Sequence, residues 1–296
     1  MRFLYRAALV FLFLAPAAAL ALGKGEPTPD CKDCGHWNVP QKPFRVYGNT
    51  YYVGTAELSS ILITSDGGDI LIDGDLNESA PQIADNIKAL GFRLSDVKLI
   101  LNSHAHYDHA GGIAQLQRMT GAAVKASPWS AKLFANGEPG KDDQQYGILQ
   151  PIARIAHAGT LHDGETVHVG SLALTAHFTP GHTGGGTSWT WQSCEAGRCL
   201  NMAYVDSLST AAAPGFRFSD HQDLLRTFDK SFDAVAGLPC DILLTPHPDV
   251  SKTMDRFARR EKGEADAFVD SAAWHNVADS FRAGMQKRLA QEKAGK

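Results

Sequence analysis

The sequence has little that points to a membrane or to a nucleic acid. Past its N-terminus it contains no apolar run long enough to span a bilayer, and no fixed-period repeat is evident. Positive charge is not in excess, since 28 lysines and arginines stand against 32 aspartates and glutamates, a formal net charge of −4. Binding a polyanion needs a basic surface, so we expect no nucleic-acid partner. The 296 residues, 44% of them hydrophobic, suffice for one large domain.

The one apolar stretch of note lies at the N-terminus. Arg2 and Arg6 precede the apolar run Ala7–Leu14, and small residues follow it up to Ala21. This order is typical of a secretory signal peptide, which we predict over residues 1–21. A membrane anchor is the alternative, but the run is short for a span and is broken at Pro16. We therefore expect a periplasmic protein with no membrane attachment after cleavage.

Cysteine is also scarce, with five in the chain. In an exported protein these are candidates for disulfides. Cys194 and Cys199 flank a short loop between two strand-like runs, so we predict a bridge between them. Cys31 and Cys34 could pair with each other, or one of them could reach Cys240. A redox or zinc motif at Cys31 is a further alternative, although no second CxxC completes a zinc knuckle.

Apolar periodicity divides the rest of the chain into strands and helices. Residues 22–42 are polar and proline-containing and predict an irregular arm, followed by one domain over residues 43–296. Period-2 and continuous apolar runs predict strands at 44–47, 50–53, 60–64, 69–73, 97–101, 187–191, 202–205 and 241–245, and two strands within 166–178. Helical spacing is present at 83–90, 113–119 and 223–236, and in a long amphipathic helix over 265–293. The alternation indicates an α/β fold.

Metal-capable side chains crowd the end of the apolar run 97–101. His104, His106, Asp108 and His109 fall within six positions there. In extended backbone the first three share a face, and a turn at 107–109, with two glycines behind it to relax the backbone, lets all four converge on two adjacent points. Neutral imidazoles and carboxylates are zinc ligands, and catalytic zinc keeps a position open for water. The spacing predicts a hydrolase with two Zn²⁺ ions per chain.

Two later histidines complete the expected ligand set. His182 lies in the loop TPGHTGGG after one strand, and His247 lies in TPHPD after another. Strand ends gather at one edge of layered α/β folds, so one remote histidine can join His104 and His106 while the other joins Asp108 and His109. The alternative, histidines that bind no metal, does not explain three separate strand ends that each carry them.

These motifs are similar to those of a known family. HAHYDH with the later GHT and PHP resembles the metallo-β-lactamase superfamily, from about Phe44 to the C-terminal helix. The resemblance implies a four-layered αβ/βα sandwich, in which two mixed sheets pack face to face with helices outside. That fold hosts β-lactamases, glyoxalase-type thioesterases, lactonases and nucleases, so the fold alone does not select a substrate. YGNTYYVGT, AYVDSLS and CDILLTPHP resemble subclass B3 in particular.

The subclass resemblance assigns roles to the site residues. It implies that the first zinc is held by His104, His106 and His182, and the second by Asp108, His109 and His247. Asp108 would also act as the catalytic residue that orients a hydroxide shared by the two ions for attack on the lactam carbonyl.

Two serines would contact the substrate. The resemblance implies that Ser207 and Ser209 bind the substrate carboxylate, with strand-end capping as the alternative. Ser207 stands where other subclasses have a cysteine ligand. We expect a monomer whose partner is a small-molecule β-lactam.

Two other functions remain open from the sequence. A lactonase or a glyoxalase-type hydrolase of the same fold would use a bridging aspartate, for which Asp206 is the candidate. We expect Asp206 and Ser207 to point to opposite faces of a strand, so that only one of them can face the metals. The resemblance of DSLS favours Ser207. A periplasmic zinc carrier without activity is the second alternative function.

The chain also departs from the subclass pattern, because Ala272–Trp274 and Ala56 stand where relatives have cysteines. Cys240 is therefore expected to be unpaired.

Overall fold

The computed structural model describes residue 28 and residues 31–295, and the predicted signal peptide lies outside these residues. One sheet has seven strands in the order β1-β2-β3-β4-β5-β6-β7. Strands β1 to β4 pair antiparallel and β4 to β7 pair parallel, so the sheet is mixed. Its strands are β1 (Phe44–Tyr47), β2 (Thr50–Tyr52), β3 (Ile61–Ile63), β4 (Asp69–Ile72), β5 (Val97–Leu101), β6 (Ala123–Ala126) and β7 (Ala158–Thr160).

The second sheet has five strands in the order β12-β11-β10-β9-β8. Only the β11–β12 pair is parallel, so this sheet is mixed as well. Its strands are β8 (Thr166–Val169), β9 (Leu172–Phe178), β10 (Thr187–Glu195), β11 (Arg198–Tyr204) and β12 (Ile242–Leu244). A disulfide joins Cys194 to Cys199, which face each other across the β10–β11 ladder. A second disulfide joins Cys31 to Cys34, and Cys240 is buried and free.

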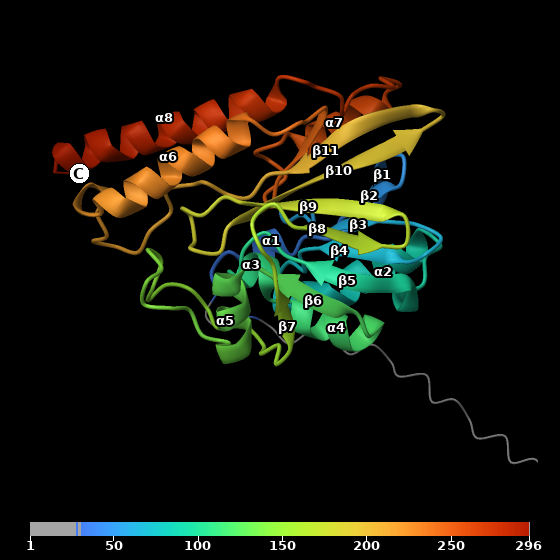
Figure 1. Cartoon of the computed structure of the whole chain (residues 1–296), viewed down its shortest axis with the longest axis horizontal. Coiled ribbons are helices and arrows are strands. Elements are labelled where there is room, and N and C mark those ends of the chain that lie inside the picture. The colour runs from blue at the N-terminus through green and yellow to red at the C-terminus, as the bar shows by residue number, and fades with distance from the viewer. Residues whose placement is uncertain (1–27, 29–30, 296) are drawn as a thin grey trace, which may run out of the picture.

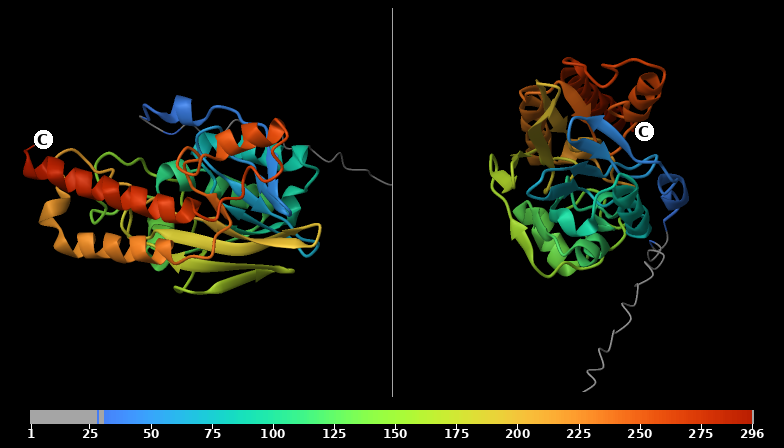
Figure 2. Two further views of the ribbon diagram at one scale, coloured as in Figure 1. Left: turned by 90° about the horizontal axis from the view of Figure 1, so that it is seen from above. Right: turned by 90° about the vertical axis from the view of Figure 1, so that its right-hand side faces the viewer.

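Helices cover the two outer faces of the paired sheets (Figures 1 and 2). The α-helices are α1 (Cys34–Trp37), α2 (Ala80–Ala89), α3 (Tyr107–Ala110), α4 (Ile113–Thr120), α5 (Pro128–Asn136), α6 (Gln222–Ala236), α7 (Thr253–Glu261) and α8 (Ala273–Lys293). Three 3-10 turns are η1 (Asn77–Ser79), η2 (Leu94–Asp96) and η3 (Phe218–Asp220). Helices α2, α4 and α5 share an apolar cluster with the first sheet, and α6 and α8 share one with the second. Among the residues described, no helix combines the length and the apolar character that crossing a membrane requires.

The continuous apolar runs of the sequence arise because each central strand is buried on both faces. In β5, Leu99 and Leu101 point into the core between the two sheets, and Ile100 points to the helices outside. Strand β12 divides in the same way, with Ile242 and Leu244 between the sheets and Leu243 toward α6 and α8. A strand with two buried faces carries no polar alternation. The expected four-layered αβ/βα sandwich is confirmed.

The last helix is shorter than predicted. Helicity was expected from residue 265, but α8 begins at Ala273. Before it the chain turns at Asp270, whose carboxylate accepts a hydrogen bond from the Ala272 amide at 3.1 Å and pairs with Arg256 of α7 at 2.9 Å. Phe268, assigned to the helix face by its spacing, packs instead between the two sheets. A long-range ion pair therefore overrides the helical periodicity at this point.

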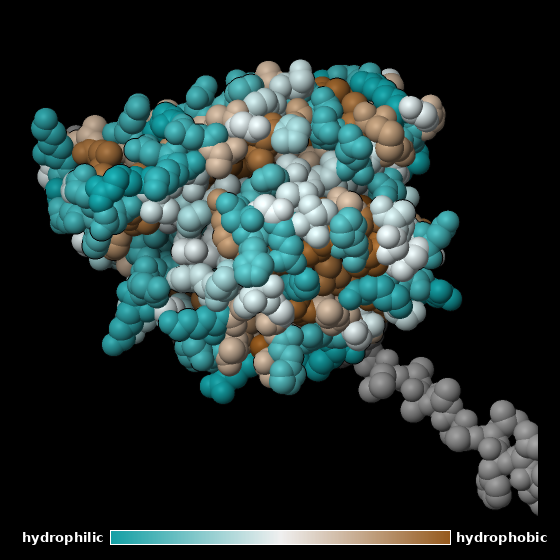
Figure 3. Space-filling model, viewed as in Figure 1, coloured by the Kyte–Doolittle hydropathy of each residue, from teal (hydrophilic) through white to brown (hydrophobic). Residues whose placement is uncertain are grey.

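The surface is largely hydrophilic on the face shown in Figure 3. Within the described ranges, the large hydrophobic side chains that stand exposed are Val39 at 43%, Tyr146 at 47% and Ile148 at 45%. Val39 lies in the arm before β1, and the other two lie in the loop between α5 and β7. Single exposed apolar side chains are common, but these three belong to the two segments that border the histidine-rich strand ends.

Candidate metal centre

The crowded motif leaves β5 as extended chain and then forms one helical turn. His106 has φ −75° and ψ 154° and precedes α3, so Asp108 and His109 project from a helix and not from a loose turn. Behind them, Gly111 and Gly112 have helical backbone angles that any residue adopts. A Cβ at Gly111 would lie 2.4 Å from the Tyr107 carbonyl oxygen, and one at Gly112 would lie 2.2 Å from that of Gly74. The glycines are needed for close packing and not, as predicted, for backbone freedom.

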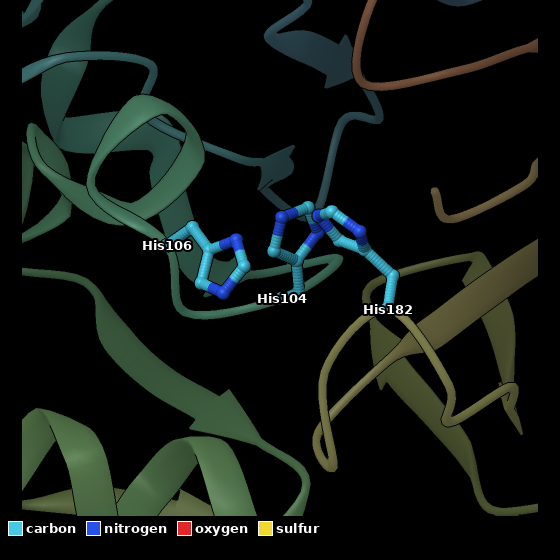
Figure 4. A group of neighbouring side chains, drawn as sticks. All are labelled: His104, His106 and His182. Atoms are coloured by element: carbon cyan, nitrogen blue, oxygen red, sulfur yellow. The ribbon is translucent and has the colours of Figure 1, made fainter. Parts of the chain in front are cut away.

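A first group of three buried histidines meets between the two sheets' ends. Donor atoms of His104, His106 and His182 all lie within 4.8 Å of one another. The His104 ring centroid is 4.7 Å from that of His106 and 5.0 Å from that of His182. Figure 4 shows the three rings turned toward one another, His182 arriving from the loop after β9. Residues 78 positions apart in the chain therefore form one cluster.

Each histidine of the first group has one ring nitrogen held by a protein oxygen. The three contacts are His104 Nδ1 to Asp206 Oδ1 at 2.7 Å, His106 Nε2 to Asp143 Oδ2 at 3.0 Å, and His182 Nδ1 to the Ser209 carbonyl at 3.1 Å. An imidazole that donates through one nitrogen presents a lone pair on the other. The remaining nitrogens are Nε2 of His104, Nδ1 of His106 and Nε2 of His182. His104 Nε2 is buried with no hydrogen-bond partner among the described residues.

Burial keeps two of these imidazoles, those of His104 and His182, neutral. It lowers the pKa of His104 well below its ordinary value, and the neighbouring His109 and His106 lower it further. The pKa of His182 is lowered well below the ordinary value in the same way, by burial first and then by His106 and His104. A neutral imidazole is the form that binds a metal ion. Three converging imidazoles, each with its second ring nitrogen held by an oxygen, therefore fit Zn²⁺, for which nitrogen ligands are ordinary.

A second group lies beside the first. Asp108 Oδ2 is 3.2 Å from His109 Nε2 and 3.4 Å from His247 Nε2. Two ligands of a tetrahedral zinc ion with bonds of about 2.0–2.1 Å are separated by about 3.3 Å, which these distances match. His104 also lies with its donor atom within 4.8 Å of those of Asp108 and His109, so the two groups adjoin.

The charges of the second group suit a cation. Burial raises the pKa of Asp108, but the charge of His109 and the hydrogen bonds to His109 and His247 outweigh it, so the pKa falls well below its ordinary value. For His247 burial lowers the pKa, and the hydrogen bond to Asp108 raises it above the ordinary value on balance. Asp108 is thus an anion near neutral pH, as a metal ligand must be.

Asp206 and the two serines follow the end of β11 at Tyr204 and have different contacts. Asp206 is fully buried and contacts the nitrogen of His104 that faces away from the other rings. It orients the His104 ring through the nitrogen that does not face the metal site. The groups of converging donors among the described residues include neither Asp206 nor His247. Ser209 places its hydroxyl 3.1 Å from His182 Nδ1, and its amide donates to Ser207 Oγ at 3.4 Å. Both serines are half-buried beside the first group, which is compatible with the predicted contact to substrate.

The arm and the loop between α5 and β7 flank the two groups. In the arm, the Trp37 ring lies 5.9 Å from the His247 ring and 6.2 Å from that of Tyr107. The Thr55 hydroxyl donates to the Trp37 carbonyl at 2.6 Å, which fixes the arm on the domain. On the other side, the Gln145 amide nitrogen lies 3.4 Å from His106 Nδ1 and from His182 Nε2. The arm thus contacts the second group, and the loop contacts the first.

Sequence reasoning missed the carboxylates behind the ligands. Asp73, at the end of β4, accepts hydrogen bonds from the amide and the hydroxyl of Ser103 and from Tyr204, each at 2.7 Å. Burial raises its pKa to about 8 against these hydrogen bonds. This network joins the ends of β4 and β11 directly under His104. The sequence carries one signal for Asp73, which is its position directly after the buried strand run 69–72.

Comparison with known proteins agrees with this geometry. The family model of the metallo-beta-lactamase superfamily matches residues 56–196. The solved structure of MEM-A1, a subclass B3 metallo-beta-lactamase from a soil metagenome library, is 50% identical with a TM-score of 0.85, covering 88% of this chain and 100% of that one. Rm3 metallo-beta-lactamase is also 50% identical, with a TM-score of 0.87 and coverage of 90% and 100%.

Curated relatives match over a shorter span. An N-acyl homoserine lactonase of Rhizobium radiobacter is 32% identical over 163 residues, which are 51% of this chain and 60% of that relative. The first curated relatives are thus spanned over less than two thirds of their length. MEM-A1 and Rm3, in contrast, are covered completely at higher identity. The chain therefore belongs to the metallo-β-lactamase superfamily and, within it, to subclass B3.

Proposed function

We propose that this chain is a periplasmic dizinc hydrolase that opens the amide ring of β-lactam antibiotics and so confers resistance to them. The observation that carries the proposal is the pair of adjoining groups of converging donors, His104 with His106 and His182, and His104 with Asp108 and His109. His247 Nε2 lies beside the second group, 3.4 Å from Asp108 Oδ2. Identity of 50% to subclass B3 enzymes over their full length supports β-lactams as the substrate class.

Two zinc ions would have distinct ligands. His104 Nε2, His106 Nδ1 and His182 Nε2 would hold the first, and Asp108, His109 and His247 would hold the second. When bound, such a pair supplies Lewis-acid polarisation of a carbonyl and water of lowered pKa.

The chain's own residues supply orientation and negative charge. Asp206 and the Ser209 carbonyl fix the rings of His104 and His182, so the donor nitrogens are set before a metal arrives. Asp108 remains ionised and can accept a proton or a hydrogen bond from a nucleophile placed between the groups. Ser209 offers a hydroxyl next to the first group, in reach of an anionic substrate group. No serine or cysteine nucleophile is required.

The test combines metal analysis with a substrate panel. Purified protein should contain two zinc ions per chain and hydrolyse nitrocefin, a penicillin and a carbapenem. Dialysis against a chelator should abolish this activity, and added zinc should restore it. His182→Ala should lose the activity, whereas His177→Ala should keep it, because His177 bonds to Thr190 on the second sheet, away from both groups.

Three results would contradict the proposal. Hydrolysis that survives complete zinc removal would exclude the metal mechanism. Hydrolysis of a homoserine lactone or a glutathione thioester without any β-lactam would indicate the alternative hydrolases of this fold. Tight binding of two zinc ions with no hydrolysis at all would indicate a zinc carrier. Expression in a susceptible bacterium, with fractionation of its cells, tests export and resistance together.

A further inference from the structure

The loop from residue 137 to residue 157 buries a carboxylate next to the first metal group. It joins α5 to β7 without any helix or strand. Most of the loop is exposed, but Asp143 and Gln144 are each only 5% exposed. A buried carboxylate is costly unless it is hydrogen-bonded or paired. The hydrogen-bond partners of Asp143 therefore explain why the loop is buried at this position.

The loop fastens two of the three histidines of the first group. Asp143 Oδ2 lies 3.0 Å from His106 Nε2, and its other oxygen accepts the Gln145 amide at 2.8 Å. The Gln144 side chain donates to the backbone carbonyl of His182 at 2.7 Å and to that of Gly181 at 3.0 Å. Consecutive residues of one loop thus hold one ligand by its ring and another by its backbone.

His106 differs from the other two histidines in the nitrogen that it offers. His104 and His182 present Nε2, whereas His106 presents Nδ1, because Asp143 occupies its Nε2. A carboxylate at that nitrogen selects the tautomer, prevents a ring flip and raises the basicity of the donor nitrogen.

We propose that Asp143 is the positioning residue of the first metal site and that it couples zinc binding to the order of the loop 137–157. This rests on the proposed function in that the ligand is zinc. Coupling follows because Asp143 belongs to the loop, while His106 belongs to the segment after β5. An interaction that fixes the His106 ring, such as zinc binding, therefore also fixes the loop through Asp143. By linkage, an ordered loop favours zinc binding to the same degree.

The first test compares two neighbouring aspartates. Asp143→Asn removes the charge at His106 with little change of shape. Asp142→Asn is the matched control, since Asp142 is exposed and its hydrogen-bond partner among the described residues is Trp129 Nε1, at 3.1 Å. Metal-free protein is titrated with zinc against a chromophoric chelator. We expect the first-site affinity to fall about 10- to 100-fold in Asp143→Asn and to stay within about 2-fold in the control. Equal affinities in the two variants would overturn the proposal.

A spectroscopic readout separates positioning from general destabilisation. Cobalt(II) in place of zinc reports ligand geometry through its visible absorption. The first-site band should shift in Asp143→Asn and remain unchanged in Asp142→Asn. An unchanged band in both would overturn the assignment of Asp143 to ring orientation.

The unmodified protein provides a test that does not depend on a variant's folding. Amide hydrogen exchange of residues 138–150 is measured in the full chain with and without zinc, with residues 166–178 of β8 and β9 as the internal reference. We expect zinc to slow exchange in the loop and to leave the reference unaffected. Loop exchange that is indifferent to zinc would overturn the coupling.

The outcomes are distinguishable from failure of the proposed function. Zinc binding that depends on Asp143, in a protein that hydrolyses no β-lactam, would sink the proposed activity and leave the positioning role standing. β-Lactam hydrolysis with zinc affinity that is independent of Asp143 would do the reverse.

Discussion

Glu292 near the C-terminus should contribute measurably to stability through its charge. Its buried carboxylate accepts the backbone amides of Phe218 and Ser219, each at 2.9 Å, and the guanidinium of Arg288 at 2.9 Å. Burial would raise its pKa, but the hydrogen bonds from Ser219, Arg288 and Phe218 outweigh burial and lower it from 4.5 to about 2. Helix α8 is thereby tied to η3, which follows the segment that carries Ser207 and Ser209.

The magnitude follows from the difference between the two states. A pKa of about 2 in the folded chain against 4.5 in the unfolded chain, at about 1.4 kcal/mol per unit, corresponds to about 3 kcal/mol of stability. Because the folded pKa is the lower one, this contribution is complete above pH 4.5 and is lost as the pH falls toward 2. Glu292→Gln keeps the shape and one acceptor, so we expect a loss of about 2–3 kcal/mol at neutral pH.

The assay is urea unfolding of metal-free protein with intact disulfides. Zinc must be absent, because protonation of the histidine ligands would release it within the same pH range and mask the effect. The difference in the free energy of unfolding between the unmodified protein and Glu292→Gln, the gap, should have its full value at pH 7 and should become smaller toward pH 3. Asp279→Asn, an exposed position on the same helix, is the control and should open no gap. A gap that stays constant from pH 7 to pH 3 would refute the electrostatic reasoning.

Three further predictions concern the site and the sheets. Asp206→Ala leaves His104 Nδ1 without its acceptor, so first-site zinc affinity should fall about 10-fold or more, measured by chelator competition. Ser209→Ala should raise KM for a β-lactam about 3- to 10-fold with little change in zinc content, since the backbone carbonyl still holds the metal-binding histidine. Replacing Cys194 and Cys199 by serine should lower the free energy of unfolding by about 2 kcal/mol and leave hydrolysis intact, in denaturation and nitrocefin assays.

The candidate ligand residues could be named from the sequence because each of them follows a predicted strand. His104, His106, Asp108 and His109 follow a buried strand at a spacing that few structural needs explain, and His182 and His247 each follow another strand. Metal binding restricts which residue types can be ligands, and the ends of the predicted strands restrict where in the fold these residues can lie. The two constraints together suffice without knowledge of the tertiary contacts.

Residues behind the ligands carry no such local signal. Asp143 stands in the polar stretch KDDQQYG, which is typical of a solvated loop, and nothing local distinguishes it from Asp142. Only the approach of His106 makes one of the two buried. Helix α7 was missed as well: Met254 and Phe257 form its short apolar face against the core between the sheets, and charged residues dominate the rest of the helix. Partners distant in sequence decide both cases.

The metal donors connect parts of the molecule that no disulfide joins within the described ranges. The two bridges close separations of three and five residues, so neither ties one sheet to the other. The donors do, because four of them follow β5 of the first sheet while His182 and His247 follow β9 and β12 of the second. His104 Nε2, the nitrogen that faces the metal site, is buried without a hydrogen-bond partner among the described residues, and such an atom costs about 1–3 kcal/mol. Bringing the histidines together between the two sheets therefore lowers the stability of the metal-free chain. A metal ion that binds only the folded chain offsets this loss.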